Sequence, residues 1–127
     1  MSVRVDSLDH IVLTVRDISA AVSFYVGVLG MTEILFGDRT AVGFGSQKIN
    51  LHQAGAEIAP HATAPAPGSS DLCFLSSVPL DHWVSHLAKQ GVPIELGPVP
   101  RTGALGSITS IYLRDPDGNL IEISNPV

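Results

Sequence analysis

The chain has few of the residues that mark secreted or nucleic-acid-binding proteins. Cys73 is its single cysteine, so no disulfide can form within the chain, and a reducing intracellular setting is the simplest inference. Only 7 lysines and arginines stand against 12 aspartates and glutamates, the basic residues do not cluster, and the formal net charge is −5. This balance argues against nucleic acid or an anionic membrane as a partner, so we expect a small-molecule ligand.

Long hydrophobic runs are also missing from the start of the chain. Arg4, Asp6 and Asp9 interrupt residues 1–10, so this stretch predicts neither a signal peptide nor a membrane span, and we expect a cytoplasmic protein. The length of 127 residues favours one domain. Because 45% of the residues are hydrophobic and only 15% are charged, part of the apolar surface is expected to be buried in a homodimer.

Hydrophobic periodicity predicts the order βαβββ for the first half of the chain. Residues 8–15 alternate between apolar and polar, which indicates a strand, and Asp17 then begins a helix that ends at Gly30. The helix carries its apolar residues at helical spacing, at Ile18, Val22, Tyr25, Val26 and Leu29. Three short strands are predicted after it, at 33–36, 41–44 and 48–52.

The same order returns after a linker rich in proline and alanine, residues 55–70. A strand is predicted at 71–76, followed by a helix with Pro79 as its first residue and Gly91 as its end. Further strands are predicted at 93–96, 108–113 and 119–124, with residues 97–106 as a loop and the segment Asp115-Pro116-Asp117-Gly118 as a tight turn.

The two halves align at an offset of 61 residues, which places His10 on Asp71 and Gly30 on Gly91. We therefore predict a single α+β domain made of two βαβββ modules, at about 6–54 and 70–125.

Polar residues on the first and last strand of each module form the candidate site. These residues are His10 and His52 in the first module and Asp71 and Glu122 in the second. Two imidazoles and a carboxylate from separate strands suit Fe(II), Mn(II), Zn(II) or Ni(II) and leave coordination positions open for a substrate. Asn50 shares a face with His52, so either residue can be the counterpart of Glu122.

Several of these residues also have structural interpretations. Asp71 either binds a metal or begins its strand as an exposed carboxylate, and His52 is either a ligand or a hydrogen-bonded histidine inside the fold. Arg101, Ser110 and Tyr112 either bind a substrate anion or hydroxyl group or serve the structure. Cys73 has no activating neighbour in the sequence and is expected to be a buried, inert thiol.

Two sequence segments and the internal repeat resemble the vicinal oxygen chelate superfamily, which includes glyoxalase I, fosfomycin-resistance proteins, extradiol dioxygenases and bleomycin-binding proteins. The segments are LDHIVLTVRDISAAVSFYVGVLGM and SIYLRDPDGNLIEIS. The resemblance implies that the modules form a curved, barrel-like mixed sheet with the helices outside and with His10 and Glu122 at metal-ligand positions. The chain departs from the pattern at Asp71, where many members have His, and at Asn50 and His52, where several have Glu.

The resemblance and the residues together predict a metal-dependent enzyme of glyoxalase or dioxygenase type, either a lyase or isomerase or an oxidoreductase. His10, His52 and Glu122 would hold the divalent ion, with Asp71 as an open fourth candidate, and two adjacent oxygens of a small substrate would bind it. Glu122 would also serve as the catalytic base. The alternative is a metal-free protein that sequesters a drug, as the bleomycin-binding members do.

Overall fold

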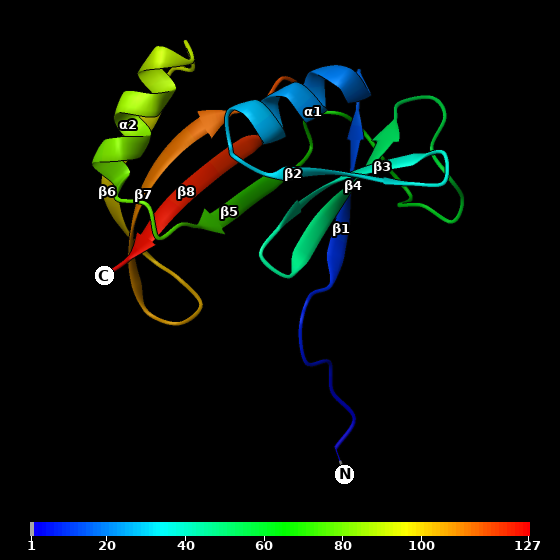
Figure 1. Cartoon of the computed structure of the whole chain (residues 1–127). Helices are drawn as coiled ribbons and strands as arrows, with labels where there is room; N and C mark the ends of the chain where they lie inside the picture. The colour runs from blue at the N-terminus through cyan, green and yellow to red at the C-terminus, as the bar shows by residue number, and fades with distance from the viewer. Residues whose placement is uncertain (1) are drawn as a thin grey trace. The chain divides into compact units, whose positions relative to one another are not determined.

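The computed structural model describes residues 2–127 and divides the chain into two compact units, Met1–Ala66 and Pro67–Val127. Each unit contains one four-stranded mixed sheet and one helix, in the order βαβββ (Figure 1). The predicted α+β class and the predicted order of elements are therefore confirmed. The strands of the described residues form two separate sheets, one in each unit, rather than one continuous sheet.

Unit 1 contains β1 (His10–Val15), α1 (Ile18–Gly27), β2 (Thr32–Phe36), β3 (Arg39–Phe44) and β4 (Gln47–Gln53). The strand order is β1-β4-β3-β2, with β1 parallel to β4 and the other neighbours antiparallel. A parallel pair needs a long crossover, and α1 with the β2–β3 hairpin supplies it. The chain therefore brings the first and last strands of the module side by side.

Asp17 begins α1 as predicted. Its Oδ1 accepts a hydrogen bond from the Ser19 backbone N–H at 2.9 Å, which satisfies one of the free donors at the helix start. The helix buries Ala21, Phe24 and Tyr25 and packs on β2, β3 and β4. Burial of these apolar side chains stabilises the unit through the hydrophobic effect.

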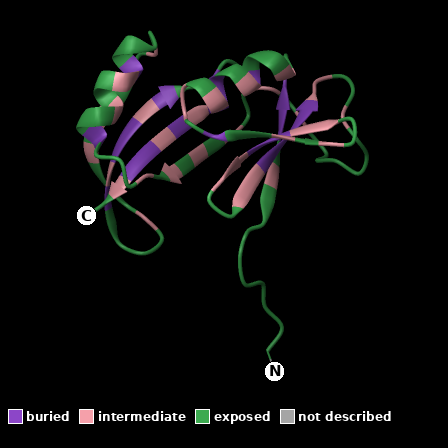
Figure 2. Ribbon diagram, viewed as in Figure 1, coloured by how far each residue is buried: buried purple, intermediate pink, exposed green. Residues whose placement is uncertain are grey.

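Unit 2 contains β5 (Asp71–Leu75), α2 (Leu80–Lys89), β6 (Leu96–Thr102), β7 (Ser107–Arg114) and β8 (Leu120–Pro126). Its strand order, β5-β8-β7-β6, repeats the topology of unit 1, with β5 parallel to β8. Figure 2 shows that buried residues are concentrated in β7 and β8, the two central strands of this sheet. Residues 54–70, before β5, contain neither helix nor strand, as predicted for this segment.

The second helix starts one residue later than predicted, because Pro79 is its N-cap and Leu80 its first helical residue. Leu80 and Leu87 are the buried residues of α2. Each helix has 10 residues, and none in residues 2–127 has the length and apolar character needed to cross a bilayer.

The prediction for β6 was wrong. A strand was expected at 93–96 and a loop at 97–106, but the strand runs from Leu96 to Thr102. Pro98 and Pro100 lack a backbone N–H, which counts against a central strand but not against an edge strand, where one side of the backbone has no neighbour. β6 is the edge of its sheet, and its pairing with β7 is irregular between Leu96 and Val99.

The tight turn before β8 is confirmed. The Asp115 carboxylate accepts hydrogen bonds from the backbone N–H groups of Asp117 and Asn119, at 2.9 and 2.8 Å, and from the Asn119 side chain at 2.7 Å. Gly118 has φ of 86°, a left-handed conformation that glycine adopts without a steric cost. This network fixes where β8 begins and therefore the position of Glu122 along it.

Candidate metal and substrate site

In unit 1, the register of β1 and β4 decides which polar residues lie together. His10 is opposite Lys48, and His52 is opposite Thr14, four residues further along both strands. At the usual rise of a strand, four residues correspond to about 13 Å. Unit 1 therefore does not bring the two histidines together, whereas Asn50 lies between them on the same face of β4.

Unit 2 has the same arrangement. Asp71 begins β5 opposite Leu120, and Glu122 follows two residues later, opposite Cys73. In unit 1, His10 begins β1 opposite Lys48, and Asn50 likewise lies two residues after Lys48 on β4. The register therefore makes Asn50 the counterpart of Glu122, a choice that the sequence left open.

Asn50 has a buried side-chain oxygen without a partner. The residue is 5% exposed, and among the described residues its Oδ1 is the one buried side-chain nitrogen or oxygen that has no hydrogen bond. Leaving a buried polar group unpaired costs on the order of 1–3 kcal/mol. An amide oxygen in this state is well suited to a cation or to a hydrogen-bond donor of a ligand.

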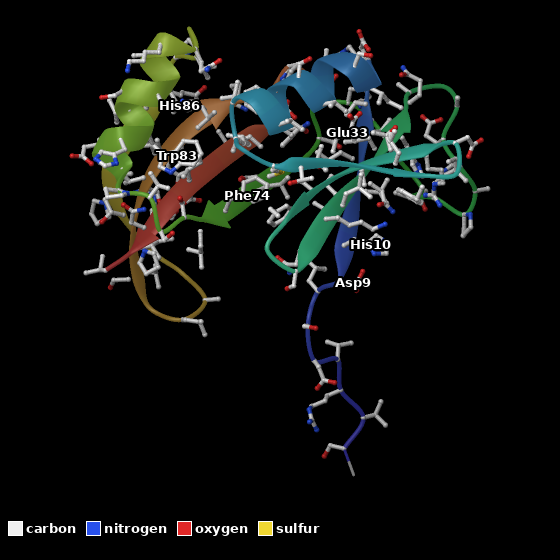
Figure 3. The ribbon with its side chains drawn as sticks, in the orientation of Figure 1. Asp9, His10, Glu33, Phe74, Trp83 and His86 are labelled. Carbon is white, nitrogen blue, oxygen red and sulfur yellow. The ribbon has the colours of Figure 1, made fainter. Side chains whose placement is uncertain are left out.

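His10 is half-exposed at the start of β1, next to Asp9 (Figure 3). Its Nδ1 lies 2.9 Å from Asp9 Oδ1. When Nδ1 carries the proton and donates to this carboxylate, Nε2 keeps its lone pair available for a metal ion. The ring therefore has the carboxylate contact that commonly orients a metal-binding histidine.

His52 has a different environment. It is 4% exposed, and its Nε2 lies 3.4 Å from an Arg39 guanidinium nitrogen. Burial, followed by the positive charge of Arg39, lowers the pKa of His52 below its ordinary value of 6.5. A guanidinium at this ring nitrogen competes for the lone pair and repels a metal cation, which favours the interpretation of His52 as a hydrogen-bonded histidine inside the fold.

Two serines hold the Glu122 carboxylate. Ser110 Oγ donates to Glu122 Oε2 at 2.5 Å, and Ser124 Oγ lies 2.6 Å from Ser110 Oγ and 3.4 Å from Oε2. Both serines are fully buried, so the surrounding packed atoms restrain their side chains. The hydrogen bonds fall on one carboxylate oxygen, Oε2, and thereby orient the other.

A pocket of about 410 Å³ lies on this face of unit 2, and its lining includes Arg101, Tyr112 and Glu122. The Arg101 Nε donates to the Tyr112 hydroxyl at 2.9 Å, and its guanidinium carbon lies 5.4 Å from the centre of the Tyr112 ring. Tyr112 is in turn opposite Glu122 in the β7–β8 ladder. The structure therefore brings three of the candidate residues into one pocket, with Ser110 packed against the carboxylate.

Cys73 lines the same pocket and is exposed, so the expectation of a buried thiol was wrong. Its Sγ lies 3.3 Å from Ser124 Oγ. Desolvation raises the pKa of the Cys73 thiol above its ordinary value, and the nearby Glu122 charge raises it further. A raised pKa keeps the thiol protonated near neutral pH, so Cys73 is a poor nucleophile, in line with the expected inert character.

Neither unit, within residues 2–127, gathers three or more His, Cys, Asp or Glu side chains that could hold a metal ion. Unit 1 offers an imidazole and an amide oxygen, His10 and Asn50, from two adjacent strands. Unit 2 offers two carboxylates, Glu122 and the exposed Asp71. Within unit 1, an imidazole nitrogen and an amide oxygen are donor types that suit a divalent ion, whereas the register does not place His52 beside His10.

Residues 7–123 match the family model of the Glyoxalase/Bleomycin resistance protein/Dioxygenase superfamily. The chain belongs to this superfamily. The resemblance noted from the two sequence segments is therefore confirmed, and it extends over nearly the whole chain.

Similar proteins of this superfamily occur in bacteria and in a fungus. Virulence protein STM3117 of Salmonella typhimurium is 55% identical over 124 residues, which cover 97% of this chain and 86% of that protein. Its crystal structure superimposes with a TM-score of 0.96, at 54% identity, over 98% of this chain and 100% of that one. The glyoxalase domain-containing protein RDO1 of Mycosarcoma maydis is 52% identical over 126 residues, covering 98% of this chain and 70% of that protein.

A third similar protein is an integron cassette protein from Vibrio cholerae, whose structure has a TM-score of 0.97 and 52% identity, with 100% of both chains covered. These names state a superfamily, a biological association or a genetic origin, and they do not state a reaction. Within a superfamily the reaction depends on the residues of the individual site.

Proposed function

We propose that this superfamily member is a metal-dependent enzyme of glyoxalase or dioxygenase type. In the proposal, His10 and Glu122 are candidate ligands of a divalent ion, Fe, Mn, Ni or Zn, and Asp71 and the Asn50 amide oxygen are further candidate donors. The observation that carries it is the buried, unpaired Oδ1 of Asn50 at the position equivalent to Glu122. When bound, such an ion would act as a Lewis acid toward two adjacent oxygens of a small substrate.

The side chains of unit 2 have distinct roles in this proposal. Ser110 donates to Glu122 Oε2 and holds the carboxylate in one orientation, so that the other oxygen can accept a proton from substrate. Arg101, whose guanidinium is held by the Tyr112 hydroxyl, binds and orients a polar or anionic group of the substrate. The pocket of about 410 Å³ is of a size that suits a small molecule.

Replacing Glu122 with Gln tests the proposal. We expect wild-type protein purified without a tag to retain close to one metal ion per site by elemental mass spectrometry, and the E122Q variant to lose that metal. The reason is that an amide oxygen carries no net charge and binds a divalent ion more weakly than a carboxylate does. A circular dichroism spectrum matching wild type would show that the E122Q fold is intact.

The matched control is Glu33→Gln, which removes one exposed carboxylate from β2 of unit 1 (Figure 3). This variant should keep the metal. Equal metal retention by E122Q and wild type would show that Glu122 is not a ligand and would remove the proposed site.

A metal-free binding protein is the second candidate function, and the apolar part of the unit 2 pocket favours it. Leu75, Ala104 and Ile108 line this pocket beside Arg101. If this function is correct, purified protein should contain substoichiometric metal, and adding Ni(II), Zn(II), Mn(II) or Fe(II) should leave the thermal unfolding midpoint unchanged. A ligand that binds only the folded state would still raise that midpoint.

A further inference from the structure

One face of the unit 1 sheet carries basic side chains and no carboxylate from its strands. The face that contains Asn50 also contains His10, Arg39, Lys48 and His52, as the alternation and register of the strands require. Glu33 is the one acidic residue in the four strands and lies on the opposite face. This concentration of positive charge contrasts with the net charge of −5 for the whole chain.

Two of these cations share one aromatic ring. The Lys48 ammonium lies 4.0 Å from the centre of the Phe36 ring, and the Arg39 guanidinium carbon lies 5.0 Å from the same centre. Neither cation forms an ion pair with a carboxylate of residues 2–127. Contacts with an aromatic face attract cations without neutralising them, so both charges at this ring lack a carboxylate counter-ion.

Lys48 also lines a pocket of about 440 Å³ on this face, together with Thr32, Ile34 and Gly43. A Cβ on Gly43 would lie 2.7 Å from Ile34 Cδ1, so only glycine leaves this side chain undisturbed. Asp9 contributes a carboxylate to the pocket lining, and its Oδ1 is paired with His10 Nδ1. The pocket therefore offers a partly apolar wall next to an ammonium group that has no carboxylate partner.

We propose that this face of unit 1 binds an organic oxyanion, a compound with a carboxylate, phosphate or phosphonate group. Arg39 and Lys48 hold the charged oxygens, and the body of the compound lies in the pocket against Ile34. The planar guanidinium supplies paired donors to an oxyanion, and the ammonium supplies a point charge. Arg39 and Lys48 are not among the proposed metal ligands, and neither lines the Arg101 pocket of unit 2. Because Lys48 lies opposite the proposed ligand His10 in the β1–β4 ladder, the site is tested on protein from which metal has been removed.

Calorimetric titration of the EDTA-treated full chain tests the site, with phenylphosphonate as the probe. We expect phenylphosphonate to bind at low ionic strength, and inorganic phosphate to bind more weakly because it has no body to fill the pocket. Benzamide, which is neutral, should not bind. Raising the salt concentration should weaken binding, because the cations are partly exposed and are screened.

The variants R39Q and K48Q should each weaken phenylphosphonate binding at least tenfold, because each loses a charged hydrogen bond. Arg39→Lys keeps the charge and should retain part of the affinity, which separates loss of charge from loss of fold. Lys89→Gln removes one exposed charge from the end of α2 and should bind as wild type does.

Wild-type affinity in both R39Q and K48Q would overturn the proposal, as would binding of benzamide as tight as that of phenylphosphonate. Equal affinity for phosphate and phenylphosphonate would overturn the proposal that the body of the compound lies in the pocket, because the phenyl group would then add nothing to the binding.

Discussion

Asn50 and Glu122 occupy equivalent positions in the two sheets, but their surroundings differ. Glu122 accepts a hydrogen bond from Ser110, whereas the Asn50 side-chain oxygen is buried and accepts no hydrogen bond. Across the ladder, Asn50 faces Ala41, which has no polar side chain, while Glu122 faces Tyr112. A buried amide oxygen without a hydrogen bond reduces stability unless a ligand binds it, so a bound cation should have a measurable effect at this residue.

Replacing Asn50 with Asp should change stability in opposite directions with and without metal. In EDTA the thermal unfolding midpoint should fall, because a carboxylate is costlier to bury than an amide. On adding Mn(II) or Ni(II) the midpoint should rise more than in wild type, because the carboxylate binds the ion more strongly. Gln90→Glu, which adds the same charge at the exposed end of α2, should show neither change. An identical metal response in N50D and wild type would remove Asn50 from the site.

His52 should make the free energy of unfolding depend on pH. Because burial and Arg39 lower the pKa of folded His52 below 6.5, the unfolded chain takes up a proton before the folded chain does as pH falls. Stability should therefore decrease as pH drops from about 7 through 6.5 toward the lowered value. In the His52→Gln variant this decrease should be smaller in urea unfolding between pH 5 and 7.5. His82→Gln on the exposed side of α2 should retain the wild-type dependence.

The strands and helices show how local sequence and position in the sheet combine. α1 begins at a residue that caps it, whereas α2 begins at Pro79, which supplies no side-chain hydrogen bond. β6 contains two prolines and still forms a strand because it is an edge with β7 on one side only. The helix start could be read from the residues themselves, but the edge strand could not, because its neighbours are distant in sequence.

Removing the cap of α1 should destabilise the protein measurably. Replacing Asp17 with Ala removes the hydrogen bond to the Ser19 N–H and should lower the free energy of unfolding by about 1 kcal/mol. Urea unfolding monitored by circular dichroism measures the change. Asp38→Ala removes an exposed aspartate from the turn between β2 and β3, and should cost less. Equal losses in the two variants would show that the cap contributes nothing beyond its charge.

At the scale of the whole chain, one topology is used twice with different side chains. In both units the first strand pairs in parallel with the last strand. Asn50 in unit 1 and Glu122 in unit 2 each lie two residues after the residue that faces the start of the first strand. In unit 1 this topology carries a basic face that includes an imidazole and an amide. In unit 2 it carries a carboxylate that lines a pocket. Superfamily membership accounts for the architecture, and the residues on these faces must account for the chemistry.

The apolar surface of the chain predicts a homodimer. Leu35 and Leu105 are 71% and 100% exposed, and 45% of all residues are hydrophobic. Sedimentation equilibrium at micromolar concentration should give twice the chain mass of 13.3 kDa. Replacing Leu35 and Leu105 separately with Ser would show whether either lies in the interface. A single-chain mass at all concentrations would contradict the prediction.

The sequence by itself determined the features that depend on nearby residues. The β1 strand, the Asp17 cap, the Asp115 turn and the repeated order βαβββ could all be predicted from the chain, because propensity, capping and turn geometry act over a few residues. The choice of His10 and Glu122 followed from strand starts and ends and from the family resemblance, and both remain proposed ligands.

Only the tertiary structure decided which residues face one another. Asn50 and His52 lie on the same side of β4, and a shift of two residues preserves every side-chain direction, so the periodicity could not choose between them. The pairing of β1 with β4, which are far apart in the sequence of unit 1, makes Asn50 the counterpart of Glu122. It places His10 opposite Lys48, and His52 lies beside Arg39. Register depends on packing between distant segments, and for that reason the partners of the candidate site could not be read from the sequence.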